Sequence, residues 1–103
     1  MSWRFVIHPR ASDQLAALPA DVDERIRRKL KEMVTSEWRD LHEYDVERIR
    51  GCDHEIYRTR IGDYRVFFLA EEPVAAILHV AKRDRAYGNT GQLDSRADDF
   101  ETE

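Results

Sequence analysis

Apolar residues between positions 21 and 35 recur at the spacing of one helical face. The recurring residues are Val22, Ile26, Leu30 and Met33. Asp21, followed three residues later by Glu24, has the spacing of a capping box, which satisfies free backbone N–H groups at a helix start. The pattern therefore predicts an amphipathic helix that begins after Asp21 and turns one apolar stripe toward a core.

Two shorter elements are predicted before this helix. Residues Trp3–Ile7 are rich in aromatic and β-branched side chains, which is typical of a strand, and Pro9 ends that segment. In Ser12–Leu18 the apolar residues fall on one helical face, and Pro19 closes the segment. The fold is therefore expected to start with a strand and two helices.

Three apolar segments further along have the character of strands: Glu55–Ile61, Tyr64–Leu69 and Val74–Lys82. Turn-forming residues at 62–63 and 71–73 separate them, which predicts two tight hairpins. Residues 35–53 show no steady period, so we predict a loop there with at most a helical turn.

The order of these elements predicts an α+β fold. An N-terminal strand and a helical hairpin are followed by an antiparallel three-strand meander, and all the strands form one sheet that the helices cover on one face. A single domain is expected over residues 1–90. Residues 91–103 are acidic and contain turn formers, so we expect a flexible C-terminal tail or a frayed helix that folding does not need.

Composition limits the class of protein. The chain has 103 residues, of which 42% are hydrophobic and 37% charged, enough for one core under a highly charged surface. No apolar run reaches the roughly 20 residues of a membrane helix, and the N-terminus lacks the apolar stretch of a signal peptide, so a cytoplasmic location is expected. Cys52 is the single cysteine, which excludes an internal disulfide and indicates an inert thiol.

The charge is distributed unevenly. The net charge is −4, but five of the 21 acids and only one of the 17 bases lie in the last ten residues, so the body of the chain is neutral. Within that body, bases crowd into two short segments, and the sequence predicts a basic patch there. These bases are Arg58, Arg60, Arg65, Lys82, Arg83 and Arg85.

The same two segments resemble a known family. Residues 57–68, YRTRIGDYRVFF, resemble the signature hairpin of the RelE/ParE toxin superfamily, and residues 80–87, VAKRDRAY, are similar to its closing strand, where a basic pair is followed by a tyrosine. The likeness extends over roughly residues 3 to 88. It implies a RelE-like fold and the toxin of a type II toxin–antitoxin system, with a cognate antitoxin protein as partner.

The resemblance leaves the target open, because one fold can carry several functions. RelE-like members cut mRNA in the ribosomal A site, whereas ParE-like members poison DNA gyrase. Our leading hypothesis is a ribosome-dependent mRNA endoribonuclease. The alternatives are a gyrase inhibitor and a catalytically silent module that binds only the antitoxin.

For RNA cleavage the resemblance implies a set of residues by position. Metal-independent attack by the 2′-hydroxyl needs a base on that hydroxyl and cations around the phosphorane. The catalytic positions match Arg58, Arg60, Arg65, Arg83 and Tyr87, with Tyr87 where the family stacks a tyrosine on a base. Lys82 and Arg85 are the expected additional contacts to the RNA substrate.

The general base is not fixed by this match. Arg58 and Arg60 stand where RelE-like nucleases commonly have lysines, and a guanidinium is a poor proton acceptor. The sequence offers His79 and Glu55 as possible acid or base groups, with Asp84 and Tyr87 as further candidates. The remaining histidines, His8, His42 and His54, show no zinc-ligand spacing and have no matching pair of an acid and a base around them, so neither a metal nor another cofactor is expected.

Overall fold

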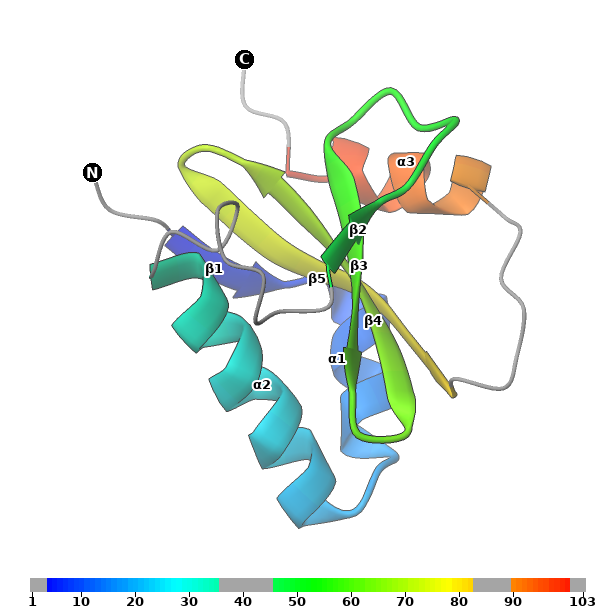
Figure 1. Ribbon diagram of the computed structural model, residues 1–103. Coiled ribbons are helices and arrows are strands. Elements are labelled where there is room, and N and C mark those ends of the chain that lie inside the picture. The colour runs from blue at the N-terminus through cyan, green and yellow to red at the C-terminus, as the bar shows by residue number, and fades with distance from the viewer. Residues whose placement is uncertain (1–3, 36–45, 83–89, 101–103) are drawn as a thin grey trace.

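The computed structural model describes residues 4–35, 46–82 and 90–100 of the chain. The elements, in chain order, are β1 (Arg4–Ile7), α1 (Pro9–Ala16), α2 (Ala20–Thr35), β2 (Val46–Arg48), β3 (Ile56–Ile61), β4 (Tyr64–Glu71), β5 (Val74–Lys82) and α3 (Thr90–Asp98). Figure 1 shows α1 and α2 as a hairpin beside one sheet, with α3 at the other side of the strands. The predicted α+β class is confirmed.

The strands form one five-stranded sheet in the order β1-β5-β4-β3-β2. The three predicted strands of the meander form β3, β4 and β5, and both hairpins turn where the sequence predicts. Gly62 takes a positive φ of 60° at the first turn position, a conformation that glycine adopts without a steric cost. The sheet is mixed rather than purely antiparallel, because β1 pairs in parallel with β5.

The prediction of a loop from residue 35 to residue 53 was wrong at β2. Val46–Arg48 pairs antiparallel with β3 and forms an edge of the sheet. A three-residue strand is too short to show a period of two, so only its tertiary pairing defines it. The rest of the uncertain segment, residues 36–45, lies outside the described residues.

Both helices begin earlier than the sequence predicts. Helix α1 begins at Pro9, and the His8 side chain caps it by accepting a hydrogen bond from the Arg10 backbone N–H. Helix α2 begins at Ala20, so Asp21 is not its N-cap but lies in the first turn with Asp23. Acids there still favour the helix, because they face the positive end of its dipole.

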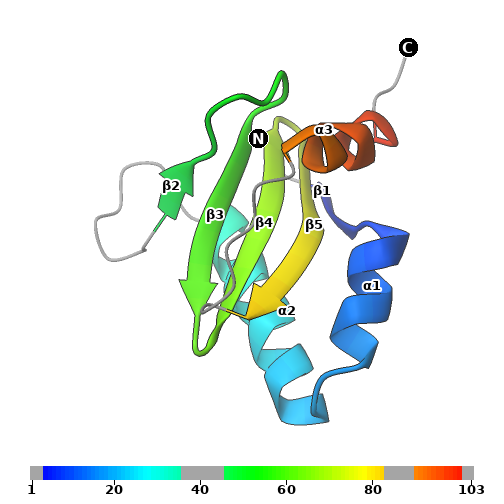
Figure 2. The ribbon, with the colours of Figure 1, turned by 90° about the vertical axis from the view of Figure 1, so that its right-hand side faces the viewer.

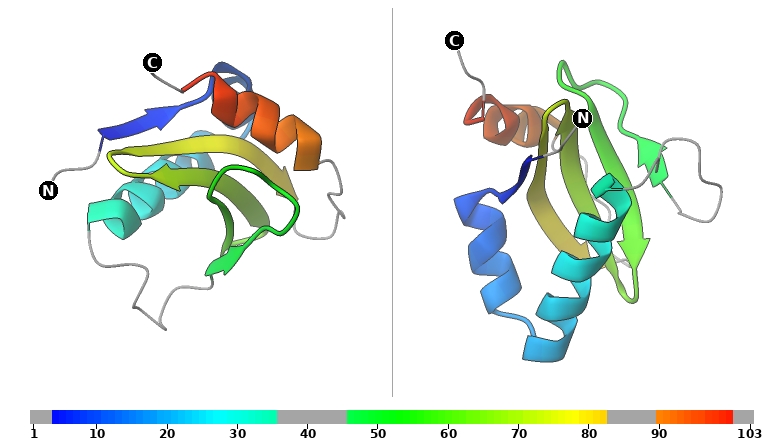
Figure 3. Two further views of the ribbon diagram at one scale, coloured as in Figure 1. Left: turned by 90° about the horizontal axis from the view of Figure 1, so that it is seen from above. Right: turned by 90° about the vertical axis from the view of Figure 1, so that its left-hand side faces the viewer.

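The sheet has a core on each face. Helices α1 and α2 cover the first face, where Leu15, Ile26 and Leu30 are buried against Phe68 and Ile77. Helix α3 covers part of the second face (Figure 3). There the buried residues are Ile56, Phe67, Leu69, Val74, Ala76 and Leu78 from the sheet and Leu93 and Ala97 from α3.

Helix α3 differs from the expected flexible tail. Leu93 and Ala97 are fully buried, four residues apart, so they lie on the same side of the helix. Figure 2 shows α3 lying beside the upper ends of β3 to β5. The sequence analysis did not count these two residues as an apolar face because two apolar positions in nine are too few for a visible period.

A bulge in β5 changes which side chains face α3. The pairing of β4 with β5 shifts between Phe67 and Phe68, so Phe67 lies opposite His79 while Phe68 lies opposite Ile77. Leu78 is the extra residue, and both it and His79 consequently lie on the second face. The bulge places His79 on the same face of the sheet as the arginines described below.

Candidate functional site

Three of the predicted site residues share one face of the sheet. Arg58 and Arg60 alternate along β3, and Arg60 lies directly opposite Arg65 on β4. This is the second face, because Arg58 pairs with Phe67, which packs in the core under α3. We call the area around Arg58, Arg60 and Arg65 the basic face. In the described part of the chain, α3 contacts the opposite end of these strands, near Ile56 and Leu69.

Two facing arginines can bind an anion between them. Like charges directly opposite each other on neighbouring strands destabilise a sheet, and an anion between them removes that cost. The guanidinium group is planar and carries several N–H donors, which suits phosphate oxygens. Arg60 is exposed and Arg65 is half-buried, so an anion can reach both.

Glu47 on β2 brings a carboxylate to the same face. It lies directly opposite Arg58 and forms an ion pair with the Nη2 group of that arginine. The Glu47 side chain is 63% exposed, so substrate can approach it. The sequence analysis did not offer Glu47 as an acid or base, because the strand that carries it was not predicted.

His79 lies at the border between the basic face and α3. Its Nδ1 is 3.2 Å from Nε2 of Gln14 on α1 and 3.1 Å from Nη1 of Arg96 on α3. Its ring lies 5.8 Å from the Phe67 ring. Burial and the nearby Arg96 charge lower the pKa of His79 to about 4, so the imidazole is neutral at physiological pH.

This environment argues against His79 as a general base. Arg96 can only donate hydrogen bonds, so the lone pair on Nδ1 of His79 is already engaged. A base with a pKa near 4 is also weak at pH 7. Among the described residues, Glu47 is therefore the better candidate for a proton acceptor beside the arginines.

The structure does not bring Glu55 to the basic face. Glu55 precedes β3, and its carboxylate lies 3.4 Å from the Tyr57 hydroxyl. Five residues of strand separate it from Arg60, which corresponds to about 16 Å. That distance is too long for Glu55 and the Arg60–Arg65 pair to act on one phosphodiester.

The remaining predicted residues lie at or beyond the end of β5. Lys82 is exposed and pairs with Tyr64, whose side chain packs against the first core, so Lys82 leaves the sheet on the face opposite to the arginines. Arg83, Asp84, Arg85 and Tyr87 lie outside the described residues. Their proposed roles rest on the sequence alone.

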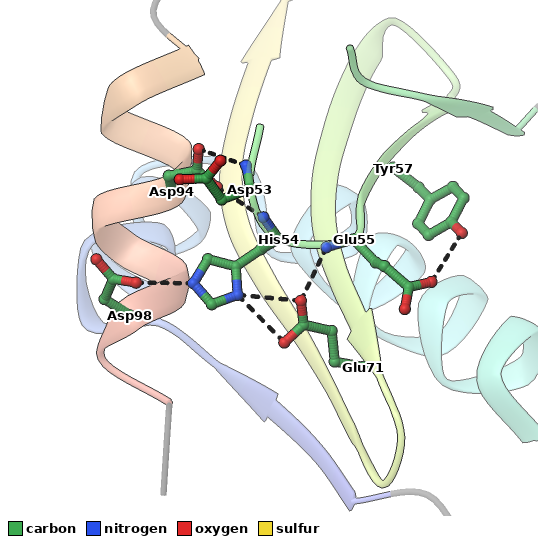
Figure 4. Close-up of polar contacts among 7 residues, drawn as sticks. All are labelled: Asp53, His54, Glu55, Tyr57, Glu71, Asp94 and Asp98. Carbon is green, nitrogen blue, oxygen red and sulfur yellow. Dashed lines mark hydrogen bonds and ion pairs between the residues drawn. The ribbon is translucent and has the colours of Figure 1, made fainter. Parts of the chain in front are cut away.

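A second polar cluster surrounds His54 at the other end of the hairpin, as Figure 4 shows. The Nδ1 of His54 lies 3.0 Å from the Glu71 carboxylate on β4, and its Nε2 lies 2.7 Å from the Asp98 carboxylate on α3. Asp94 accepts hydrogen bonds from the backbone N–H groups of Asp53 and His54. The expectation that His54 has no matching groups around it was wrong, because its partners Glu71 and Asp98 lie 17 and 44 residues away in the chain.

The His54 cluster joins α3 to β4 and to the residues before β3. A carboxylate at each ring nitrogen requires a proton on both nitrogens, which is the charged imidazolium form. Burial opposes that charge, but the hydrogen bonds to Asp98 and Glu71 outweigh burial and raise the pKa of His54. His8 makes a second contact with the end of α3, because its Nε2 lies 2.6 Å from the Asp99 carboxylate.

Within the described residues, no three histidine, cysteine, aspartate or glutamate side chains are grouped so that they hold a metal ion. Burial, followed by the charges of Asp94 and Asp53, raises the pKa of Cys52, which disfavours a reactive thiolate. None of the described helices has the length and apolar character needed to cross a membrane.

Comparison with solved structures identifies the fold. A chain of the archaeal RelE–RelB complex from Pyrococcus horikoshii OT3 is 29% identical, with a TM-score of 0.67 over 84% of this chain and 100% of that chain. A doubly substituted mutant of the Escherichia coli toxin RelE in the free state is 19% identical, with a TM-score of 0.64 over 96% of this chain and 97% of that chain. The RelB–RelE complex from Methanococcus jannaschii contains a chain with 21% identity and a TM-score of 0.59, over 76% of this chain and 90% of that chain.

No protein-family model matches the chain, and no curated protein matches it in sequence. The mixed five-stranded sheet and the helical hairpin on one of its faces nevertheless define an α+β fold that the RelE structures share. Over most of its length, the chain is therefore similar in structure to RelE toxins.

Proposed function

We propose that this protein is the toxin of a type II toxin–antitoxin system and that it cleaves mRNA on the ribosome without a metal. The observation that carries the proposal is the pairing of Arg60 with Arg65 on the basic face, with Arg58 and Glu47 beside them. Three arginines and one carboxylate on an accessible sheet face fit the needs of phosphodiester cleavage better than those of protein binding alone.

In the proposed reaction, the 2′ oxygen of a ribose attacks the adjacent phosphorus and the bond from phosphorus to the 5′ oxygen breaks. The Glu47 carboxylate accepts the 2′ proton, and the 5′ oxygen leaves with a proton from solvent. The three arginines stabilise the charge that builds on the phosphorane oxygens. The products are a 2′,3′-cyclic phosphate and a 5′-hydroxyl end.

Partner, substrate and location complete the proposal. Three of the structural neighbours are toxins solved in complex with an antitoxin, and we propose an antitoxin as partner for this chain too. The substrate is mRNA bound to the ribosome, and the location is cytoplasmic. Arg83 and Tyr87 are proposed to complete the site from the segment after β5.

The deciding experiment is primer extension on mRNA from a translating extract, with and without the purified protein. New 5′ ends inside the reading frame support the proposal. Intact message together with inhibited supercoiling by DNA gyrase would instead support a ParE-like toxin. Binding to the product of an adjacent reading frame, with neither activity, would support a silent antitoxin-binding module.

A further inference from the structure

Two side chains distant in the sequence converge on one nitrogen of His79. Gln14 comes from α1 on the first face of the sheet and reaches around β5, beyond the end of its pairing with β1. Arg96 comes from α3 on the second face and is buried. The C-terminal helix, expected to be dispensable, therefore contributes a side chain at the border of the basic face.

The orientation of Gln14 is fixed by a second hydrogen bond. Its Oε1 accepts from the backbone N–H of Val80 at 2.9 Å, so the amide nitrogen, a donor, is the atom turned toward His79. A main-chain N–H cannot accept, so the amide cannot be flipped without losing this bond.

The orientation of Arg96 is fixed in the same way. Its Nη1 donates to the backbone carbonyl of Leu78 at 2.7 Å and lies 3.1 Å from Nδ1 of His79. A guanidinium has donors only, so this contact also requires a lone pair on Nδ1. Two independent donors thus exclude a hydrogen on that nitrogen.

We propose that Gln14 and Arg96 are positioning residues that hold His79 as the neutral tautomer with its hydrogen on Nε2, so that His79 serves cleavage as a hydrogen-bond donor and not as a general base. The role in cleavage rests on the proposed function, whereas the tautomer does not. A neutral N–H donor beside the arginines stabilises a phosphorane oxygen without entering the proton transfer.

The electrostatic surroundings support this assignment. Arg96 is a charged side chain that the described structure places against the ring, and it opposes a second positive charge on the imidazole. Half-burial next to the Phe67 ring opposes the charge further. The charge of Arg96 and the burial of the ring therefore both disfavour the cationic form of His79.

The tautomer is tested directly by two-bond ¹H–¹⁵N correlation spectra of the full chain, recorded between about pH 5 and pH 8. Wild-type His79 is expected to show the pattern of the Nε2–H form with no titration in that range. A hydrogen on Nδ1, or a titration near the ordinary histidine pKa, would overturn the inference whether or not the protein cleaves mRNA.

The positioning role is tested with Gln14→Glu. The new carboxylate still accepts from the Val80 N–H but has no donor for Nδ1, and its charge favours imidazolium, so the pKa of His79 should rise into the titrated range. Cleavage should fall about tenfold or more. Arg96→Met should also raise the pKa of His79. Arg28→Met, on the exposed side of α2, serves as the matched control.

The outcomes separate the two proposals. If wild type leaves mRNA intact, the proposed function fails, and the spectra alone decide the tautomer. If wild type cleaves and Gln14→Glu cleaves equally well with a changed His79 spectrum, the positioning role is overturned while the proposed function stands.

Discussion

Asp98 on α3 accepts a hydrogen bond from Nε2 of His54 at 2.7 Å, and this contact joins the C-terminal helix to the start of β3. Glu71 on β4 holds the other ring nitrogen of the same histidine. The docking of α3 is consequently linked to the charge of a single side chain. Since α3 also carries Arg96, this link extends to the border of the basic face.

The first prediction is that stability falls as pH rises from about 6 to about 8. The contacts of His54 in the folded state raise its pKa. The stability that these contacts add is fully present below the pKa of His54 in the unfolded chain, and it is lost as pH rises through the pKa in the folded state. Thermal unfolding should show a melting temperature several degrees lower at the higher pH. His54→Gln should remove most of this dependence, and an unchanged dependence in that variant would exclude His54 as its origin.

The second prediction concerns Glu47. If its carboxylate accepts the 2′ proton, Glu47→Gln should reduce mRNA cleavage about a hundredfold. Stability should change little, because an exposed ion pair contributes on the order of 0.2–1 kcal/mol. Glu72→Gln, an exposed acid in the turn between β4 and β5, is the control. Cleavage by Glu47→Gln at the rate of this control would remove Glu47 from the mechanism.

The third prediction concerns the packing of α3. Leu93 is fully buried, so Leu93→Ala should lower the free energy of unfolding by about 2–5 kcal/mol. Chemical denaturation of Leu93→Ala and of a control variant, Ser95→Ala at an exposed position of α3, measures the difference in the free energy of unfolding. A chain that ends at Gly91 should also melt at a lower temperature, whereas the sequence analysis expected that folding does not need residues 91–103. Equal midpoints for all these chains would show that α3 does not stabilise the fold.

The sequence predicted those structural elements that neighbouring residues encode, and it missed those that depend on contacts between distant segments. The helix with its stripe from Val22 to Met33 and the hairpin at Gly62 are encoded by neighbouring residues, and both are confirmed. Strand β2 and the parallel pairing of β1 with β5 depend on contacts between distant segments, and local patterns did not reveal them.

The same distinction holds for the polar groups. The shared face of Arg58 and Arg60 follows from alternation along one strand, and the facing Arg65 follows from a two-residue turn. The partners of His54 and His79 lie across the sheet, 17 to 65 residues away, and no spacing rule reaches that far. The bulge in β5, opposite Phe67 and Phe68, sets the face on which His79 lies, and no local pattern in the sequence reveals it.

The last prediction concerns Arg65, which faces Arg60 across β3 and β4. Arg65→Ala should remove one charged contact that strengthens as negative charge builds on the phosphorane, which costs about a hundredfold in rate, or about 3 kcal/mol. Arg83→Ala is expected to have an effect of the same size if the match to the family's closing strand is correct. Arg4→Ala, an exposed arginine on β1, is the surface control, and primer extension on mRNA from a translating extract is the measurement.

Folding should survive the loss of Arg65, because relief of the repulsion with Arg60 offsets any lost packing. Arg65→Lys separates charge from geometry, since lysine keeps the charge but lacks the planar pair of donors. A rate between those of wild type and Arg65→Ala is expected for it. If Arg65→Ala and Arg4→Ala cleave equally well, the basic face is not where the scissile phosphate binds. A large fall in melting temperature for Arg65→Ala would show instead that this arginine serves the fold.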